Sequence, residues 1–159
     1  MTDGPRLRQA DPSDAAALAA FHVRIWRLTY RDLAPAAAYD ALDIARRLPA
    51  WDALLASPAP DRGAVLAQGR DGIAGVVAFG PASQADLGAT AEIKHLYVDP
   101  NARGAGLGRR LLDLALDRLA RAGHARAALA VVTANNRARA FYARSGGVET
   151  ERFTDAGPL

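Results

Sequence analysis

The 159-residue sequence contains no cysteine and only three histidines. The absence of cysteine excludes disulfides, a thiolate nucleophile and every metal site with cysteine ligands, and it is consistent with a reducing compartment such as the cytoplasm. His22, His95 and His124 stand too far apart in the chain to form a local metal-binding motif. We therefore expect that the protein uses no metal ion.

Long apolar runs are also missing. None approaches the roughly 20 residues that a membrane-spanning helix needs, and the N-terminal MTDGPRLRQADPSD lacks a charged-then-apolar signal pattern. Lys94 is the only lysine, so the net charge of +3 comes almost entirely from arginines, which are spread along the chain except around 103–110. Such spreading indicates a compositional bias rather than a nucleic-acid surface. We expect a cytoplasmic protein with no membrane or nucleic-acid partner.

The length suits one domain over residues 1–159, and no repeat or linker divides the chain. Asp11 looks like the cap of a helix that ends near Tyr30, with Leu28 on its apolar face, and Pro49 predicts a kink or break in a second helical region. Because a helix separates the strands expected at 90–98 and 125–133, these two should be parallel. The predicted order is a strand at 5–10, helices at 12–30 and 35–56, a hairpin at 64–80, a strand at 90–98, a helix at 103–123, a strand at 125–133, a helix at 135–146 and a strand at 148–153.

The stretch NARGAGLGRR, residues 101–110, places three glycines and three arginines where a strand meets a helix. It is not a nucleotide P-loop, because Gly108 is followed by Arg109 and Arg110 instead of Lys-Ser/Thr. A dinucleotide-binding fingerprint is a weak fit, since Arg109 occupies its third glycine position. Glycines at 104, 106 and 108 would let the main chain approach an anion closely, and the N–H groups of the first helical turn would point at it. The stretch therefore predicts a phosphate site, the alternative being a glycine-rich turn before an amphipathic helix.

Residues 103–108 also fit the pattern Arg/Gln-x-x-Gly-x-Gly/Ala, and here the sequence resembles the GCN5-related N-acetyltransferase (GNAT) family. EIKHLYVDPNARGAGLGRRLL resembles the fourth strand, pyrophosphate loop and following helix of that family, and NNRARAFYARSG resembles its Asn-x-x-Ala-x-x-x-Tyr segment, with Asn135, Ala138 and Tyr142 in register. The resemblance extends from residue 64 to about residue 148. One departure is Gly146-Gly147, where the family has Gly-Phe.

The resemblance implies an α/β GNAT acyl-CoA N-acyltransferase fold, in which helices flank a mixed central sheet whose fourth and fifth strands splay apart. It implies acetyl-CoA as co-substrate, with pantetheine between the splayed strands and bonded to the main chain of Leu96, Tyr97 and Val98. The residues implied to surround the rest of the cofactor are Arg103, Gly104, Ala105, Gly106, Leu107, Gly108, Arg109, Asn135 and Tyr142.

Two catalytic roles follow from the same resemblance. Glu92 matches the general base that takes the proton of the amine, with an ion pair between Glu92 and an arginine on the sheet face as the structural alternative. His95, which strand alternation places on the opposite face, is the reserve base. Tyr142 matches the general acid that protonates the departing thiolate, and its alternative is packing beside Phe141.

The segment FHVRIWRLTYRDLAP resembles a bacterial subset of the family in which Trp26 and Tyr30 would form a wall of the acceptor pocket; core packing of Trp26 is the alternative. The expected function is transfer of an acetyl group from acetyl-CoA to a primary amine of a small molecule or peptide. A non-catalytic acyl-CoA-binding sensor and a transferase of a longer acyl-CoA remain open. Because family members commonly dimerise and a strand at 148–153 would leave an open sheet edge, we also expect a homodimer.

Overall fold

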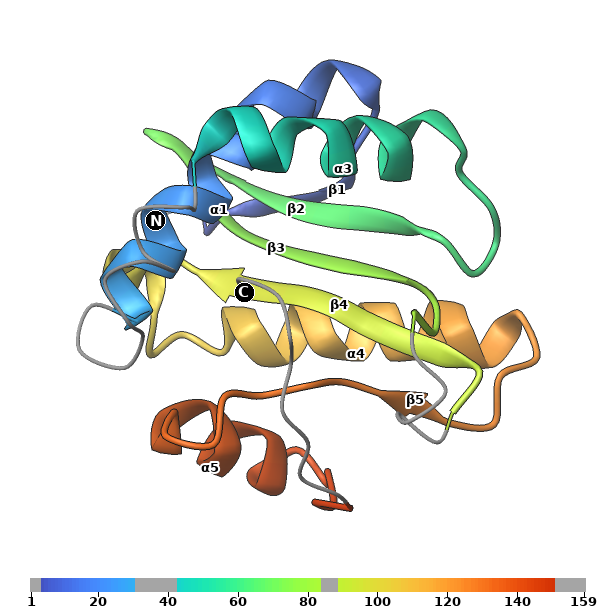
Figure 1. Ribbon diagram of the computed structural model, residues 1–159. Coiled ribbons are helices and arrows are strands. Elements are labelled where there is room, and N and C mark those ends of the chain that lie inside the picture. Colours follow the sequence, from blue (N-terminus) through green and yellow to red (C-terminus); the bar gives the residue numbers. More distant parts are fainter. Residues whose placement is uncertain (1–3, 31–42, 84–88, 151–159) are drawn as a thin grey trace.

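A mixed five-stranded sheet forms the centre of the protein (Figure 1), as seen in a computed structural model that describes residues 4–30, 43–83 and 89–150. Neighbouring strands are antiparallel from β1 to β4, and β5 runs parallel to β4. The predicted hairpin and the predicted parallel pair are thus confirmed. The strands lie side by side in chain order: β1 (Arg6–Gln9), β2 (Gly63–Gly69), β3 (Gly72–Pro81), β4 (Ala91–Val98) and β5 (Ala127–Ala128).

Helices cover both faces of this sheet (Figure 1). α1 (Ala15–Tyr30) and α3 (Ile44–Ala56) pack together on one face, and α4 (Leu107–Arg121) covers the other. α5 (Asn136–Arg144) adds Phe141 and Tyr142 to the core on the α4 side. Two short 3-10 turns, η1 (Pro12–Asp14) and η3 (Pro100–Ala102), precede α1 and α4.

Local capping explains where the helices begin and end. Asp11 caps η1 by accepting a hydrogen bond from the Ser13 amide at 2.8 Å, and Asp43 caps α3 through the Arg46 amide at 2.8 Å. Gly123, with φ of +99°, follows α4 as predicted. Pro49 does not break α3, because the buried side chains of Trp51, Leu54 and Leu55 hold its second half on the core. The expected helical residues 35–42 lie outside the described ranges.

The sheet separates two apolar cores. Leu66, Val76 and Ala78 face α1 and α3, whereas Val65, Val77 and Phe79 face α4. This alternation follows the two-residue period of the strands. Leu28, expected on the apolar face of α1, is instead 46% exposed, because it lines a cavity that also contains Arg103 and Asn135.

A β-bulge interrupts the alternation in β4. His95 pairs with Ala78 and Ile93 with the next residue, Phe79, so Lys94 is an extra residue in the strand. Ile93 therefore packs on the α4 side, while Lys94 and His95 both face α3. The side chains of Glu92, Lys94 and His95 thus share one face of the sheet, and the expectation that Glu92 and His95 lie on opposite faces is wrong.

The fourth and fifth strands separate almost at once. β5 pairs with β4 only at Ala91 with Ala127 and at Glu92 with Ala128, so the strand expected at 125–133 is reduced to two residues. Beyond Glu92, β4 has no partner strand on this edge in the described part of the chain. This separation of β4 from β5 is the splay that the resemblance implied. Residues 148–150 form no strand, contrary to expectation, and 151–153 lie outside the described ranges.

Candidate active site

The glycine stretch forms an open cradle at the start of α4. Gly104 and Gly106 have φ of +92° and +79°, which side chains rarely adopt, and a Cβ on either would have no protein atom within 4 Å. Gly106 is the N-cap of α4 and offers no side-chain cap, so the first N–H groups of the helix are not capped by a side chain. Free N–H groups at the positive end of the helix dipole favour an anion at this place.

Two arginines add positive charge beside the cradle. Arg103 and Arg137 line a cavity of about 310 Å³ together with Asn135. Burial, and then the nearby Arg137, lowers the pKa of Arg103. Arg109, expected at the cofactor, points along the helix instead and donates to Asp113 at 2.9 Å. The charge at this cavity therefore comes from Arg103 and from Arg137, which the sequence analysis did not single out.

The free edge of β4 continues the cradle toward the middle of the sheet. Leu96 and Val98 direct their side chains into the core on the α4 side, while Tyr97 packs on the α1 and α3 side. Antiparallel pairing with β3 engages the strand along its other edge. Main-chain groups of these residues on the open edge are therefore available to a ligand lying in the splay.

Tyr142, Tyr30 and Asn135 meet at the opening between α1 and α5. Asn135 caps α5 by accepting from the Ala138 amide at 3.1 Å, and its Nδ2 donates to the Tyr30 hydroxyl at 3.4 Å. Burial, with a smaller contribution from Tyr30, raises the pKa of Tyr142 well above its usual range. Tyr142 therefore remains a protonated phenol at neutral pH, able to donate a hydrogen bond. It also contacts Phe141 edge to face at 5.2 Å, so the packing alternative describes part of its environment.

The Gly146-Gly147 departure has a local consequence for Tyr142. Gly146, with φ of +94°, closes α5, and the Gly147 amide donates to the Tyr142 carbonyl at 2.8 Å. A Cβ at Gly147 would lie 2.9 Å from that carbonyl oxygen. The phenylalanine found here in the family would therefore require the backbone after Tyr142 to shift.

Glu92 lies at the start of the splay and is held by several donors. Its Oε1 accepts from the Ser83 amide at 3.1 Å, the Ser83 hydroxyl at 2.8 Å and Lys94 Nζ at 3.1 Å. The ion pair considered as an alternative role for Glu92 thus exists, although the partner is the single lysine and not an arginine. The carboxyl group is firmly oriented on the face of β4 that carries His95.

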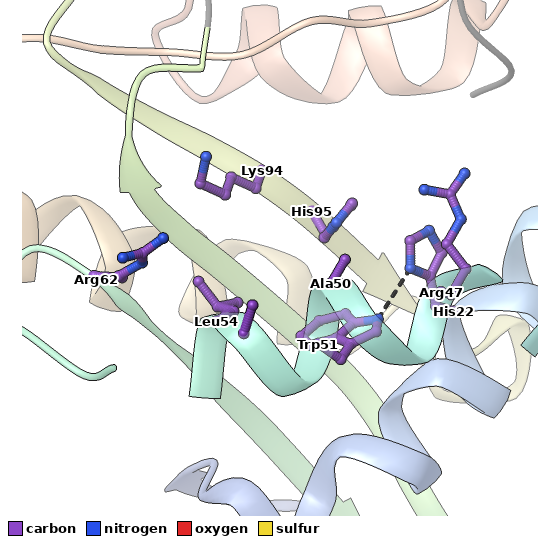
Figure 2. Close-up of a pocket in the computed structure, with 9 residues that line it drawn as sticks. His22, Arg47, Ala50, Trp51, Leu54, Arg62, Lys94 and His95 are labelled. Atoms are coloured by element: carbon purple, nitrogen blue, oxygen red, sulfur yellow. Dashed lines mark hydrogen bonds between the residues drawn. The ribbon is translucent and has the colours of Figure 1, made fainter. Parts of the chain in front are cut away.

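His95 faces a second cavity, of about 220 Å³, between α3 and β4 (Figure 2). Burial, then Arg47 and Lys94, lowers the pKa of His95 to about 4. His95 is therefore a neutral imidazole at pH 7. The cavity is lined by His22, Arg47, Ala50, Trp51, Ala53, Leu54, Arg62, Lys94 and His95.

His22 connects this cavity to Tyr97. Trp51 Nε1 donates to His22 Nδ1 at 3.2 Å (Figure 2), which leaves the proton of the neutral ring on Nε2, 3.3 Å from the Tyr97 hydroxyl. Burial, then the neighbouring His95 and Arg47, lowers the pKa of His22 to about 2. The arrangement is a neutral polar network inside the core, beside the cavity between α3 and β4.

Trp26, expected with Tyr30 at the acceptor pocket, packs in the core. Trp26 is only 2% exposed and lines neither cavity, while its ring contacts that of Tyr30 at 5.0 Å. Core packing, the alternative considered for Trp26, is what the structure shows. Tyr30 is half-buried, and its hydroxyl accepts a hydrogen bond from Asn135.

Sequence reasoning missed several residues of these cavities because no motif marks them. Arg47 comes from α3, Arg62 precedes β2 and His22 belongs to α1. They stand far apart in the sequence, so only the packing of α3 against the sheet brings them together. The described residues contain no cluster of His, Asp and Glu that could hold a metal, and none of their helices has the length and apolarity of a membrane span.

Residues 23–147 match the acetyltransferase (GNAT) family. A stretch of 58 residues is 55% identical to a mycothiol acetyltransferase of Beutenbergia cavernae and covers 36% of this chain. The match spans 20% of that relative's length, so it is a local similarity.

Solved structures share the fold across nearly the whole chain. The PaiA N-acetyltransferase of Thermoplasma acidophilum, in complex with coenzyme A, has a TM-score of 0.73 and 19% identity over 98% of this chain and 94% of that one. The aminoglycoside N-acetyltransferase AAC(6')-Iy, in complex with CoA, has a TM-score of 0.76 and 14% identity over 98% and 96%. A GCN5-related N-acetyltransferase of Ralstonia eutropha has a TM-score of 0.73 and 21% identity over 96% and 97%.

Proposed function

The chain belongs to the GNAT family of acetyltransferases, and on that premise we propose that it transfers an acetyl group from acetyl-CoA directly to a primary amine. One observation carries the proposal: the uncapped start of α4, the free edge of β4 and the helix that bears the Tyr142 phenol are adjacent, because a Cβ on Gly108 of α4 would lie 3.6 Å from Val98 of β4 and 3.5 Å from Phe141, the neighbour of Tyr142. The first part fits a pyrophosphate, the second a pantetheine chain and the third a leaving thiolate. We also propose that the reaction takes place in the cytoplasm, a reducing compartment with which the absence of cysteine is consistent.

The cradle fits the cofactor on chemical grounds. Positive φ at Gly104 and Gly106 leaves open space where a Cβ would stand, and Arg103 and Arg137 face the adjoining cavity. Charge-assisted hydrogen bonds contribute about 1.5–3 kcal/mol each. Three or four of them would supply most of the roughly 8 kcal/mol that corresponds to micromolar binding.

When bound, acetyl-CoA supplies an activated acetyl carbon: an N–C bond to the amine forms, the C–S bond breaks, and the products are an N-acetyl amide and CoA. The chain's part is to hold and move protons around this exchange. Tyr142, protonated at neutral pH, donates a proton to the leaving sulfur. Burial weakens the phenol as an acid, but the same dry surroundings raise the proton affinity of a thiolate.

The proton of the amine needs an acceptor on the other side. An alkylammonium with a pKa near 10.4 is about 3.4 pH units from neutrality at pH 7, which costs roughly 5 kcal/mol without a base. We assign this role to Glu92, whose carboxyl group is oriented by Ser83 and Lys94, and keep His95 as the reserve. The bulge in β4 puts Glu92 and His95 on the same face of the sheet, where His95 lines the second cavity and Glu92 accepts from Lys94, which also lines it. The proposed amine therefore arrives from the side of that cavity.

The direct test is release of free CoA from acetyl-CoA in the presence of a panel of primary amines. Amine-dependent release is expected, with propionyl-CoA used more slowly. Micromolar binding of acetyl-CoA by calorimetry without acetylation of any amine would favour the sensor, and faster use of the longer acyl group would favour the other transferase.

Tyr142→Phe separates the catalytic role of Tyr142 from packing. The ring remains and only the proton donor is lost, so kcat should fall by about 10²- to 10⁴-fold. The dissociation constant of acetyl-CoA and the melting temperature should stay near those of the parent protein. A fully active Phe variant would make Tyr142 a packing residue.

A further inference from the structure

The cavity between α3 and β4 is lined by three cationic side chains and, among the described residues, by no carboxylate. Figure 2 shows Arg62 and Arg47 on opposite sides of the cavity, with Lys94 and His95 between them. The three cations come from different elements: Arg47 from α3, Arg62 from the turn before β2, and Lys94 from the bulge of β4. Trp51 and Leu54 supply the apolar part of the wall.

Two of these cations have unsatisfied buried donors. The Nε atoms of Arg47 and Arg62 are buried and have no hydrogen-bond partner among the described residues. A buried donor without a partner is costly, and a guanidinium has a planar set of donors that matches carboxylate and phosphate oxygens. The pair therefore offers donors that a ligand anion would satisfy.

Lys94 adds a third positive group, and one of its ammonium hydrogens remains available to a ligand. Its ammonium donates to Glu92 Oε1 and to the Pro81 carbonyl, both at 3.1 Å, which uses two of its three hydrogens. The positive charge of Arg47 acts on its neighbours, because it contributes, after burial, to the low pKa of both His22 and His95. The cavity is thus positive, and its two histidines are neutral at pH 7.

We propose that the acceptor of this enzyme is a small primary amine that also carries an anionic oxygen group, a carboxylate or a phosphate, which Arg47 and Arg62 bind in this cavity. The inference rests on the proposed acetyl transfer and adds the class of acceptor. A cavity of about 220 Å³ suits a small anionic group and a short linker. The same charges disfavour polycationic acceptors, including aminoglycosides, by like-charge repulsion.

Matched acceptors test this inference by steady-state kinetics. We would compare 4-aminobutyrate with 4-aminobutanamide and phosphoethanolamine with ethanolamine, so that each pair shares its amine and differs in the anion. The anionic member of at least one pair should have a kcat/KM about 10- to 100-fold higher, corresponding to one or two charge-assisted hydrogen bonds. The pair with the larger ratio distinguishes carboxylate from phosphate.

Variants locate the preference in the cavity. Arg47→Gln and Arg62→Gln should raise KM for the anionic acceptor with little change in kcat, and should reduce the preference for it over its neutral analogue. Arg47→Lys should restore part of the preference, because it keeps the charge without the planar donors. Arg70→Gln is the matched control, since Arg70 lies exposed in the turn between β2 and β3. Equal rates for both members of each pair, or a preference that survives both Gln variants, would overturn the proposal.

A binding measurement separates this inference from the proposed function. N-acetyl-4-aminobutyrate and its amide contain no free amine, and their binding can be followed through the NMR signals of arginine Nε–H groups. Shifts of the Arg47 and Arg62 signals with the acid alone would support the anion site even if no amine were acetylated. Amine acetylation without such shifts would support the proposed acetyl transfer and refute the anion site.

Discussion

At the scale of one residue, the carboxyl group of Glu92 is held in one orientation by the groups around it. The resemblance alone selected it, and the structure surrounds its Oε1 with the Ser83 amide, the Ser83 hydroxyl and the Lys94 ammonium. A positioned base and a structural ion pair would both need this orientation. The two roles differ in how the rate responds to pH, because only a base becomes dispensable once the amine is already neutral.

Glu92→Gln tests that difference. The amide oxygen can still accept from Ser83, so the local fold should persist, but the side chain cannot take a proton. We expect a large loss of kcat/KM at pH 7 and recovery of much of it near pH 10, where an alkylamine is largely deprotonated. The measurement is a pH–rate profile, with His95→Gln as the comparison. A loss of equal size at every pH would assign Glu92 to structure.

At the scale of elements, α4 is the helix whose start is the proposed pyrophosphate site. Gly106 begins it with φ of +79° and no side-chain cap, and Gly123 follows its other end with φ of +99°. Neither glycine has an atom within 4 Å of the position of a Cβ. The two positions share their backbone strain and their open surroundings, and they differ in lying at opposite ends of the helix dipole.

Gly106→Glu should therefore abolish acetyl-CoA binding, and Gly123→Glu should not. Each substitution adds strain of about 1–2 kcal/mol from the left-handed backbone, but only the first brings a carboxylate to the proposed pyrophosphate site. We expect a loss of affinity of at least about 100-fold by calorimetry for Gly106→Glu. Gly106→Ala, strained but uncharged, should fall between. Equal affinities in the two Glu variants would remove the start of α4 from the site.

At the scale of the whole molecule, two neutral histidines connect stability to pH. Burial keeps the pKa of His95 at about 4 and that of His22 at about 2, whereas an unfolded histidine has a pKa near 6.5. Below about pH 6.5, His22 and His95 become protonated in the unfolded chain but stay neutral in the folded chain. The stabilising contribution is thus complete above this pH and is lost as the pH falls toward the folded pKa values.

We expect the free energy of unfolding to be flat from about pH 7 to 8 and to decrease between about pH 6 and 5 by roughly 1 kcal/mol per pH unit for each histidine. Urea titrations at several pH values measure this slope. His22→Gln should remove about half of it, after allowing for its lower stability at pH 7. A slope unchanged in the variant would contradict the assignment to His22.

The proposed homodimer also belongs to this scale. Val148, the first residue of the segment 148–153 on which the expected dimer rested, is 84% exposed, and an exposed apolar side chain is compatible with a contact between chains. Light scattering at micromolar concentration should then give about twice the 16.7 kDa of one chain. A mass of one chain that persists at high concentration would refute the dimer.

The sequence by itself determined the features that depend only on residues close together in the chain. The cap at Asp11, the glycines of the cradle and the register of Asn135 with Tyr142 act within a few residues of themselves, and they predicted the helix starts correctly. The anion site that they also indicate stays a prediction. The order of strands and helices between residues 6 and 144 was also predictable, because apolar periods are local properties of a chain.

Tertiary structure alone decided what lies around these local features. One extra residue in β4 brought Lys94 and His95 to the same face, and no spacing in the sequence marks a bulge that arises from pairing with β3. The burial of Trp26, the exposure of Leu28 and the gathering of Arg47, Arg62 and Lys94 around one cavity follow from how α1 and α3 pack on the sheet. Charges contributed by distant segments add up only after folding, so the chemistry of the proposed cofactor site was readable in the sequence and that of the proposed acceptor site was not.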